Sequence, residues 1–297
     1  MLTGALVFCA GALLSTMSGF NGVLQGYVGM LGVSLATHVV GGALLVLWLL
    51  GRREKIRLWP MPWYLYSAGF LGLIQVAGSS LCVTHIGPAL TACLSVAGSL
   101  SQSILVDHFG WLGMKKEPFR ARRVPGLLVL LAGILIVNFA GQNVPLEGIS
   151  GGKVLYIFLA FLEGGLGVYS RAVNFQATVR LGRLNGSLVN YVTASILSLA
   201  LMIALGQTGS WAGFSAAPLW VYLGGVCGVG AMIINMAALK KLTLLQSGIL
   251  LLAGQLACSA LLDGVLYHSM SPGKLLGVLV VALGAALDKK TTLAGKE

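Results

Sequence analysis

The sequence predicts an all-α integral membrane protein with ten transmembrane helices, arranged as two inverted five-helix repeats. Hydrophobic residues make up 57% of the 297 residues and charged residues only 9%, whereas soluble domains carry about 25% charged residues. The mean hydropathy is +0.91. The length leaves room for about ten spans of about 20 residues with short connections, and we expect no extramembrane domain.

An internal duplication is the second basis of this prediction. Residues 62–107 align with 218–263 at a constant offset of 156, and six of the eleven pairs between 97 and 107 are identical. Upstream, an offset of 153 pairs Asn21, Gly29 and Ser34 with Asn174, Gly182 and Ser187. Each half, 1–145 and 146–297, holds an odd number of spans, so the second copy enters the membrane inverted. Inverted repeats are typical of secondary transporters.

Helices of the first repeat follow from apolar segments separated by Gly, Pro or basic residues. We expect them near residues 3–23, 31–50, 62–83, 87–107 and 124–141. Gly51 and a basic segment end the second helix, Pro62 begins the third, and Gly87-Pro88 separates the third from the fourth. Pro125-Gly126 begins the fifth, which is short for a span and is expected to stand upright.

Helices of the second repeat are expected near residues 153–173, 185–206, 217–239, 243–263 and 273–288. Lys and Arg then set the orientation, because loops with an excess of these residues face the cytoplasm. With a cytoplasmic N-terminus, seventeen of the nineteen basic residues fall inside, and only Lys153 and Lys274 fall outside. Losing one helix would scramble this separation, so we expect ten helices and two cytoplasmic termini.

One motif resembles that of a known family. The run AGSLSQSILVDHFGWLG at 97–113 resembles the AGQ…S…LDHFG signature of the YdcZ-type inner-membrane exporters of the drug/metabolite transporter (DMT) superfamily. The segment from Asn21 to Gly42, followed by a basic loop and a Pro-Trp helix start, fits the same pattern. AGQLACSALLDG at 253–264 repeats the motif more loosely. The resemblance covers the whole chain as two fused family units.

The chain departs from the family motif at two points. Ser99 stands where the family usually has Gln, and the His-Phe-Gly that follows Asp107 is absent after Asp263. The halves have diverged, as expected when one chain fixes an inverted pair that single-unit relatives form as dimers. The resemblance implies a DMT-like ten-helix transporter with a central cavity between the halves, and no particular substrate.

Glu163 is the one acidic residue of eight in the middle of a predicted span. A charge there costs about 2.5–3.5 kcal/mol on insertion scales, so such residues are rare and usually functional. Loss of water favours the protonated carboxyl group, from which an arriving cation would displace the proton. The small multidrug resistance proteins of the same superfamily are similar in carrying an essential Glu in their first helix; the matching place in the first repeat is about Ala10. The alternative is a protonated side chain that bonds a neighbouring helix.

Polar side chains on shared helix faces are expected to line a substrate cavity, because polar groups in lipid must face protein or water. The candidates are Tyr156, Ser170, Asn174, Gln75, Ser79, Ser95, Gln102, Asn235, Gln255 and His38. For each of them taken alone we expect hydrogen bonding between helices, with substrate contact as the alternative; it is the set from both halves that predicts a cavity. For His38, which the repeat matches with Tyr191, we expect a structural hydrogen bond, with proton relay as the alternative.

Two acids that the repeat matches, Asp107 and Asp263, lie at predicted helix ends. We expect structural pairing or capping there, with gating by alternate breakage of these contacts as the alternative. His85 is expected in an external loop. Five cysteines lie inside apolar segments without a CxxC pair or a histidine at ligand spacing, so we expect inert thiols, no metal and no cofactor. No HExxH, GxSxG or P-loop is present, so no enzymatic activity is expected.

These patterns predict a secondary transporter in a bacterial cytoplasmic (inner) membrane. It would export small metabolites or organic cations by alternating access, coupled to protons through Glu163. Its expected partners are a small-molecule substrate, the proton and the lipid bilayer, and no nucleic acid; a monomer suffices, and a homodimer stays open. One alternative is an importer or uniporter of a polar neutral solute such as an amino acid or nucleobase. The other is a membrane assembly protein without a transported solute.

Overall fold

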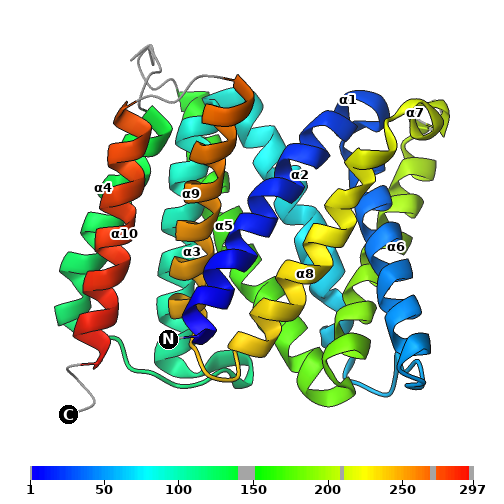
Figure 1. Ribbon diagram of the computed structural model, residues 1–297, viewed down its shortest axis with the longest axis horizontal. Helices are drawn as coiled ribbons and strands as arrows, with labels where there is room; N and C mark the ends of the chain where they lie inside the picture. Colours follow the sequence, from blue (N-terminus) through cyan, green and yellow to red (C-terminus); the bar gives the residue numbers. More distant parts are fainter. Residues whose placement is uncertain (1, 140–150, 208–210, 268–271, 294–297) are drawn as a thin grey trace. The chain divides into compact units, whose positions relative to one another are not determined.

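The computed structural model describes residues 2–139, 151–207, 211–267 and 272–293, and all regular elements in these ranges are helices (Figure 1). In this part of the chain, seven helices are long and apolar enough to cross a membrane. The protein is therefore an all-α membrane protein with several spans. Ten spans stays a prediction, because the first of the seven is a single element of 50 residues.

The helices follow the predicted order, with one short addition. They are α1 (Leu2–Gly51), α2 (Ala68–Ile86), α3 (Pro88–Phe109), α4 (Val124–Phe139), α5 (Gly151–Leu181), α6 (Arg183–Ala204), α7 (Trp211–Ala216), α8 (Leu223–Ala238), α9 (Leu244–Tyr267) and α10 (Pro272–Leu293). Single 3-10 turns are η1 (Trp63–Ser67), η2 (Trp111–Gly113), η3 (Ala121–Arg123) and η5 (Leu219–Tyr222). The short helix α7 was not expected from the sequence.

The first two predicted spans, 3–23 and 31–50, are joined in α1 without a loop, which corrects the expected connection. Gly29 leaves helical geometry inside α1, at φ 70° and ψ 177°. A straight helix of this length would measure about 75 Å, more than twice the hydrocarbon thickness of a bilayer. Glycine adopts positive φ without strain, and one such residue is enough to turn the chain. In Figure 1 the dark-blue first half of α1 rises and the lighter-blue second half descends.

The second repeat turns at the matching glycine. Gly182 separates α5 from α6 and takes φ 85° and ψ 160°, close to the conformation of Gly29. The two residues are related by the sequence offset of 153. The chain stays helical up to Gly182, so α5 ends at Leu181, beyond its predicted end at 173.

The chain divides into two compact units, and each contains segments of both repeats. Unit 1 comprises Met1–Ile74 and Tyr169–Lys241, and unit 2 comprises Gln75–Val168 and Leu242–Glu297. The chain passes from one unit to the other within α2, within α5 and between α8 and α9. The predicted boundary between residues 145 and 146 concerns the sequence repeats and stays a prediction.

In unit 1, α1 packs along α6 and α8. The buried side chains at this contact are Leu45, Leu49, Leu188, Tyr191 and Val229. Lipid tails are as apolar as these side chains, so close van der Waals packing is what favours their association. The α1 side chains in this contact come from its second half, the segment predicted as a separate span.

In unit 2, α3 packs against α9, and α4 packs against α10. Gly126 and Gly133 of α4 face Gly284 and Gly277 of α10, and a methyl group at any of the four would collide with backbone atoms of the opposite helix. Small residues allow this close approach of membrane helices. Rising residue numbers on α4 meet falling numbers on α10, so the two helices run antiparallel.

Candidate functional site

Glu163 lies in α5, with only 4% of its surface exposed. The side chain of Ser95, on α3, lies near enough to the Glu163 carboxyl group to interact with it. The Oε1 atom of this carboxyl has no hydrogen-bond partner among the described residues. An unsatisfied buried oxygen costs about 1–3 kcal/mol, and in native proteins such atoms often bind an ion or take part in chemistry. This oxygen can therefore bind a proton, a cation or a hydrogen-bond donor of a ligand.

The crossing of α3 and α5 explains why this carboxyl group is so close to α3. A Cβ atom at Gly98 would collide with the backbone oxygen of Phe161, and one at Gly164 would collide with the backbone oxygen of Ser95. Two glycines, one from each helix, thus allow the two backbones to touch. Gly164 directly follows Glu163, so the crossing places the carboxyl group beside the serine.

Two glutamine side chains lie against the same stretch of α5. Gln75 of α2 packs against Gly167, and Gln102 of α3 packs against Gly165. Gly167 is four residues from Glu163 and shares its helix face. Unit 2 therefore brings together four of the predicted residues, an acid, a serine and two amides, and the two amide side chains occupy the space beside the glycines.

Tyr156 lies two turns from Glu163, about 10 Å along the helix axis, and has a different environment. Its ring stacks on the imidazole of His85, with centroids 3.8 Å apart and an interplanar angle of 13°. The thiol of Cys82 donates to the Tyr156 carbonyl oxygen at 3.4 Å. His85 lies in the last turn of α2, which corrects its expected place in a loop, because α2 continues to Ile86.

His38 lies in α1 and is held by neighbours within unit 1. Its Nδ1 donates to the Ser34 carbonyl oxygen at 2.7 Å, and its ring centroid is 5.3 Å from that of Tyr191. The Oγ atoms of Ser34 and Ser198 are 2.8 Å apart and link α1 to α6. These contacts agree with the expected structural role of His38, and both that role and proton relay stay predictions.

The other candidates of unit 1 lie on α5 and α8. Ser170 donates to the Ala68 carbonyl oxygen at 3.1 Å. Asn174 is buried, and its Oδ1 has no hydrogen-bond partner in the described part of the chain. Asn235 is buried in α8. Ser79 and Gln255 are half-buried residues of unit 2. That all these side chains line one cavity stays a prediction.

Asp107 caps the beginning of α9. Its carboxylate accepts hydrogen bonds from the backbone N–H groups of Leu244 and Leu245, at 3.0 and 2.8 Å. The first N–H groups of a helix have no partner within the helix, and a carboxylate there also meets the positive end of the helix dipole. The backbone N–H of Glu117 donates to the Asp107 carbonyl oxygen at 2.7 Å. The side chain of Asp263 lies outside the described residues.

Sequence analysis missed an ion pair between Arg123 and Asp288. Both side chains are 4% exposed, and Arg123 donates from Nε and Nη2 to the two carboxylate oxygens at 2.7 and 2.8 Å. The pair ties the beginning of α4 to α10. In the sequence, Asp288 is visible as an acid at the end of an apolar helix. Its partner could not be predicted, because the two residues are 165 positions apart. Among the described residues, no group of three His, Cys, Asp or Glu side chains is placed to hold a metal.

Equivalent residues of the two repeats make equivalent contacts in unit 1. Gly69 packs against Thr193 of α6, and Gly225 packs against Val40 of α1. The glycines are related by the offset of 156, and their contact residues by the offset of 153. The relationship seen in the sequence is thus repeated in the packing.

The tyrosines that follow Pro62 and Pro218 show the same correspondence. The hydroxyl group of Tyr66 donates to the Leu58 carbonyl oxygen at 2.9 Å, and that of Tyr222 donates to the Phe214 carbonyl oxygen at 2.6 Å. In both cases the acceptor lies eight residues before the tyrosine. Each bond holds the chain that enters α2 or α8 against the turn that starts the helix.

The sequence profile of one protein family, described as "Putative inner membrane exporter, YdcZ", matches residues 2–136 and 155–287. The chain belongs to this family. Two separate segments match the same profile, so the chain carries two copies of the YdcZ unit. None of the curated proteins compared with the chain matches it.

Solved structures share the fold of this YdcZ-family chain. Twenty-eight chains of known structure are similar to it. One of them, titled only as the crystal structure of a protein, has a TM-score of 0.75 and 18% sequence identity, and the alignment covers 100% of this chain and 98% of the other. Membership of the YdcZ family indicates a multi-pass membrane protein that exports a small molecule, and not an enzyme.

Proposed function

We propose that the protein is a proton-coupled secondary exporter of organic cations or small metabolites, with Glu163 as the coupling acid. The observation that carries this proposal is the Glu163 carboxyl group, which is buried and has one oxygen without a hydrogen-bond partner in the described residues. Buried acids of this kind mark ion and proton pathways in membrane proteins. Membership of an exporter family supports the direction of transport.

Competition between a proton and a cation for one carboxyl group would couple the two movements. When Glu163 is protonated, the group is neutral and its burial costs least. A cation that enters the site favours the charged form, so the proton leaves as the cation binds. Ser95 lies beside the carboxyl group, and the amide side chains of Gln75 and Gln102, which pack against Gly167 and Gly165, would have to move to admit a ligand. Competition also predicts that the KM for a cation rises as pH falls.

Alternating access requires two states of similar energy, which an inverted repeat provides. The antiparallel contact of α4 with α10, which are equivalent helices of the two repeats, supports this architecture. So does the contact of α6 with the second half of α1, where Ser34 meets Ser198 and His38 meets Tyr191. Residue numbers run in opposite directions along both contacts. We propose that the second repeat is inverted in the membrane.

The test is a current measurement on purified protein in liposomes adsorbed to a solid-supported membrane. Organic cations, amino acids and nucleobases are applied with and without a pH gradient to wild type, Glu163→Gln and Glu54→Gln. Glu54 is an exposed acid paired with Arg52, so Glu54→Gln removes one carboxylate outside the site. We expect cation currents that depend on the pH gradient in wild type and in Glu54→Gln, and their loss in Glu163→Gln.

Equal currents in wild type and Glu163→Gln would refute a coupling role for this acid. A second function is then favoured by the amides, since Gln75 and Gln102 border α5 and the Oδ1 of Asn174 has no partner in the described ranges. Amide groups bind polar neutral solutes without a change of charge. Currents or uptake for neutral solutes alone, equal at pH 5.5 and 8.5, would establish an importer or uniporter of such a solute.

A further inference from the structure

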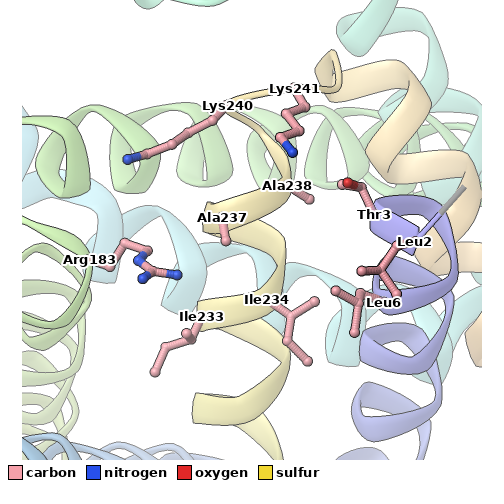
Figure 2. Close-up of a pocket in the computed structure, with 10 residues that line it drawn as sticks. All are labelled: Leu2, Thr3, Leu6, Arg183, Ile233, Ile234, Ala237, Ala238, Lys240 and Lys241. Atoms are coloured by element: carbon pink, nitrogen blue, oxygen red, sulfur yellow. The ribbon is translucent and has the colours of Figure 1, made fainter.

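A pocket of about 480 Å³ opens within unit 1 at one end of α8. It is formed by the first turns of α1, the beginning of α6 and the end of α8 with the residues that follow it (Figure 2). This end of the three helices carries basic residues and is the end predicted to face the cytoplasm. The pocket contains none of the residues assigned to the proposed transport site.

The pocket has two chemically different parts. Leu2, Leu6, Ile233 and Ile234 provide apolar surface; in Figure 2, Leu6 and Ile234 lie on the facing sides of α1 and α8, and Ile233 extends from the other side of α8, toward Arg183. Leu2 is 75% exposed and Leu6 is 45% exposed. From Ile233 to the residues after α8 the pocket extends about 10 Å along the helix axis. A pocket of this length can extend from the headgroup region of one bilayer leaflet into the adjoining part of the acyl chains.

The second part is a basic rim made of Arg183, Lys240 and Lys241. All three side chains are exposed, and none forms an ion pair with an acidic residue of the described chain. The C-terminal end of a helix carries a partial negative charge that attracts cations. Lys240 and Lys241 follow this end of α8, which has no carboxylate that could neutralise them. Three positive charges beside an apolar surface thus lack a counter-charge in the described part of the protein.

The chemistry of this pocket selects an amphiphilic anion. A cationic substrate would be repelled by the rim, and a small soluble anion would leave the exposed leucines uncovered. A phospholipid with an anionic headgroup satisfies both parts, since its phosphate meets the rim and an acyl chain covers the apolar surface. Basic pockets between membrane helices on the cytoplasmic side bind such headgroups in other proteins.

We propose that this pocket, the basic groove, is a binding site for an anionic phospholipid. The phosphate lies between Arg183 and the two lysines, where the guanidinium can bind phosphate oxygens in a bidentate manner. The acyl chain lies between the first turns of α1 and the last turns of α8. The bound lipid joins two helices that the chain connects only through more than 200 intervening residues, so it stabilises their contact as well as neutralising the rim.

The test is lipid binding by the purified full-length protein, measured by native mass spectrometry in a neutral detergent. Phosphatidylglycerol and phosphatidylcholine are titrated separately into wild type, into the triple variant Arg183→Gln/Lys240→Gln/Lys241→Gln and into Lys55→Gln/Lys115→Gln/Lys116→Gln. The second triple variant removes the same charge from loops outside the groove. We expect phosphatidylglycerol to bind about tenfold more weakly, or worse, to the first triple variant, and within twofold of wild type to the second.

Ala237→Trp fills the apolar part of the groove without changing its charge and covers the case in which the first triple variant does not fold. It should weaken phosphatidylglycerol binding at least about fivefold, while the basic rim stays intact. Glycerol phosphate added at high excess should fail to displace the lipid. Equal losses in the two triple variants, unchanged binding in Ala237→Trp, or displacement by glycerol phosphate would each overturn the proposal.

Discussion

Buried charges in this protein differ in how they are satisfied. Arg123 and Asp288 form a bidentate pair, so each charge has its partner. The Glu163 carboxyl group lies near the Ser95 side chain and has an oxygen without a hydrogen-bond partner in the described residues. The first arrangement stabilises one structure, and the second leaves a position open for a ligand.

Removing one member of the buried pair should be strongly destabilising. Arg123→Met or Asp288→Leu leaves the other charge buried, at a cost of about 3–5 kcal/mol, whereas the double variant should lose much less. The exposed pair of Arg52 and Glu54 is the control, and its disruption should cost about 0–1 kcal/mol. Thermal unfolding in detergent measures all four effects. A double variant as unstable as the sum of the two single ones would show that the charges are independent.

Sequence alone located Glu163 because its position within one apolar segment is a local property. It could not pair Glu163 with Ser95, or Arg123 with Asp288, because those contacts depend on how separate helices cross. The missing information is the side on which each helix meets its neighbours. A short run of glycines next to Glu163 indicated available space, but not which helix would approach it.

The helices of unit 2 cross at glycines, where the two backbones meet with no side chain between them. At the crossing of α3 and α5, even a methyl group at Gly164 would overlap the Ser95 carbonyl oxygen. The polar residues near Glu163 come from these same two helices and α2. A change in the crossing therefore moves the proposed site as well.

We predict that Gly164→Ala destabilises the protein by at least about 2 kcal/mol, because overpacking against a backbone forces the helices apart. Gly22→Ala is the matched control, since no atom lies within 4 Å of the Cβ position at Gly22. There the gain in helix propensity should stabilise by about 0.5–1 kcal/mol. Unfolding temperatures of the two variants should shift in opposite directions. A neutral Gly164→Ala would mean that the crossing is looser than the structure indicates.

Among the elements, prediction succeeded where a proline or glycine ends a helix and failed where the chain turns without a loop. Helices were expected to begin at Pro62 and near residue 217; 3-10 turns follow Pro62 and Pro218 there, and α2 and α8 begin a few residues later, at Ala68 and Leu223. The connection expected between 23 and 31 is absent, because Gly29 alone makes the break within α1. Composition cannot distinguish a glycine that turns the chain from one that packs inside a helix. The matching Gly182 provided the only sequence indication.

At the scale of the whole molecule, the uneven distribution of Lys and Arg predicts the orientation in the membrane. In a background in which the five native cysteines are replaced, Lys274→Cys should react with a membrane-impermeant maleimide in intact cells. Lys115→Cys should react only after the cells are permeabilised. The opposite result would place both termini outside. Labelling at both positions in intact cells would contradict the predicted number of spans between them.

The duplication recognised in the sequence accounts for the matched contacts of both units, but the assembly of the repeats could not be predicted from it. Each compact unit takes helices from both copies, so a boundary drawn between the repeats does not separate two structural units. Contacts such as Gly69 with Thr193 and Gly225 with Val40 connect the copies. One repeat alone lacks the partner surfaces for these contacts.

The contact of His38 with Tyr191 has a consequence for how the sequence could evolve. The two residues occupy the same position in the two copies and face each other, with ring centroids 5.3 Å apart. In a dimer of identical single units, this position would meet itself, and any residue there would have to tolerate its own duplicate. Two copies within one chain do not have this requirement, so a large, unequal pair can occupy the position. The exchange His38→Tyr/Tyr191→His should therefore preserve thermal stability better than either single change, which would place two identical rings together.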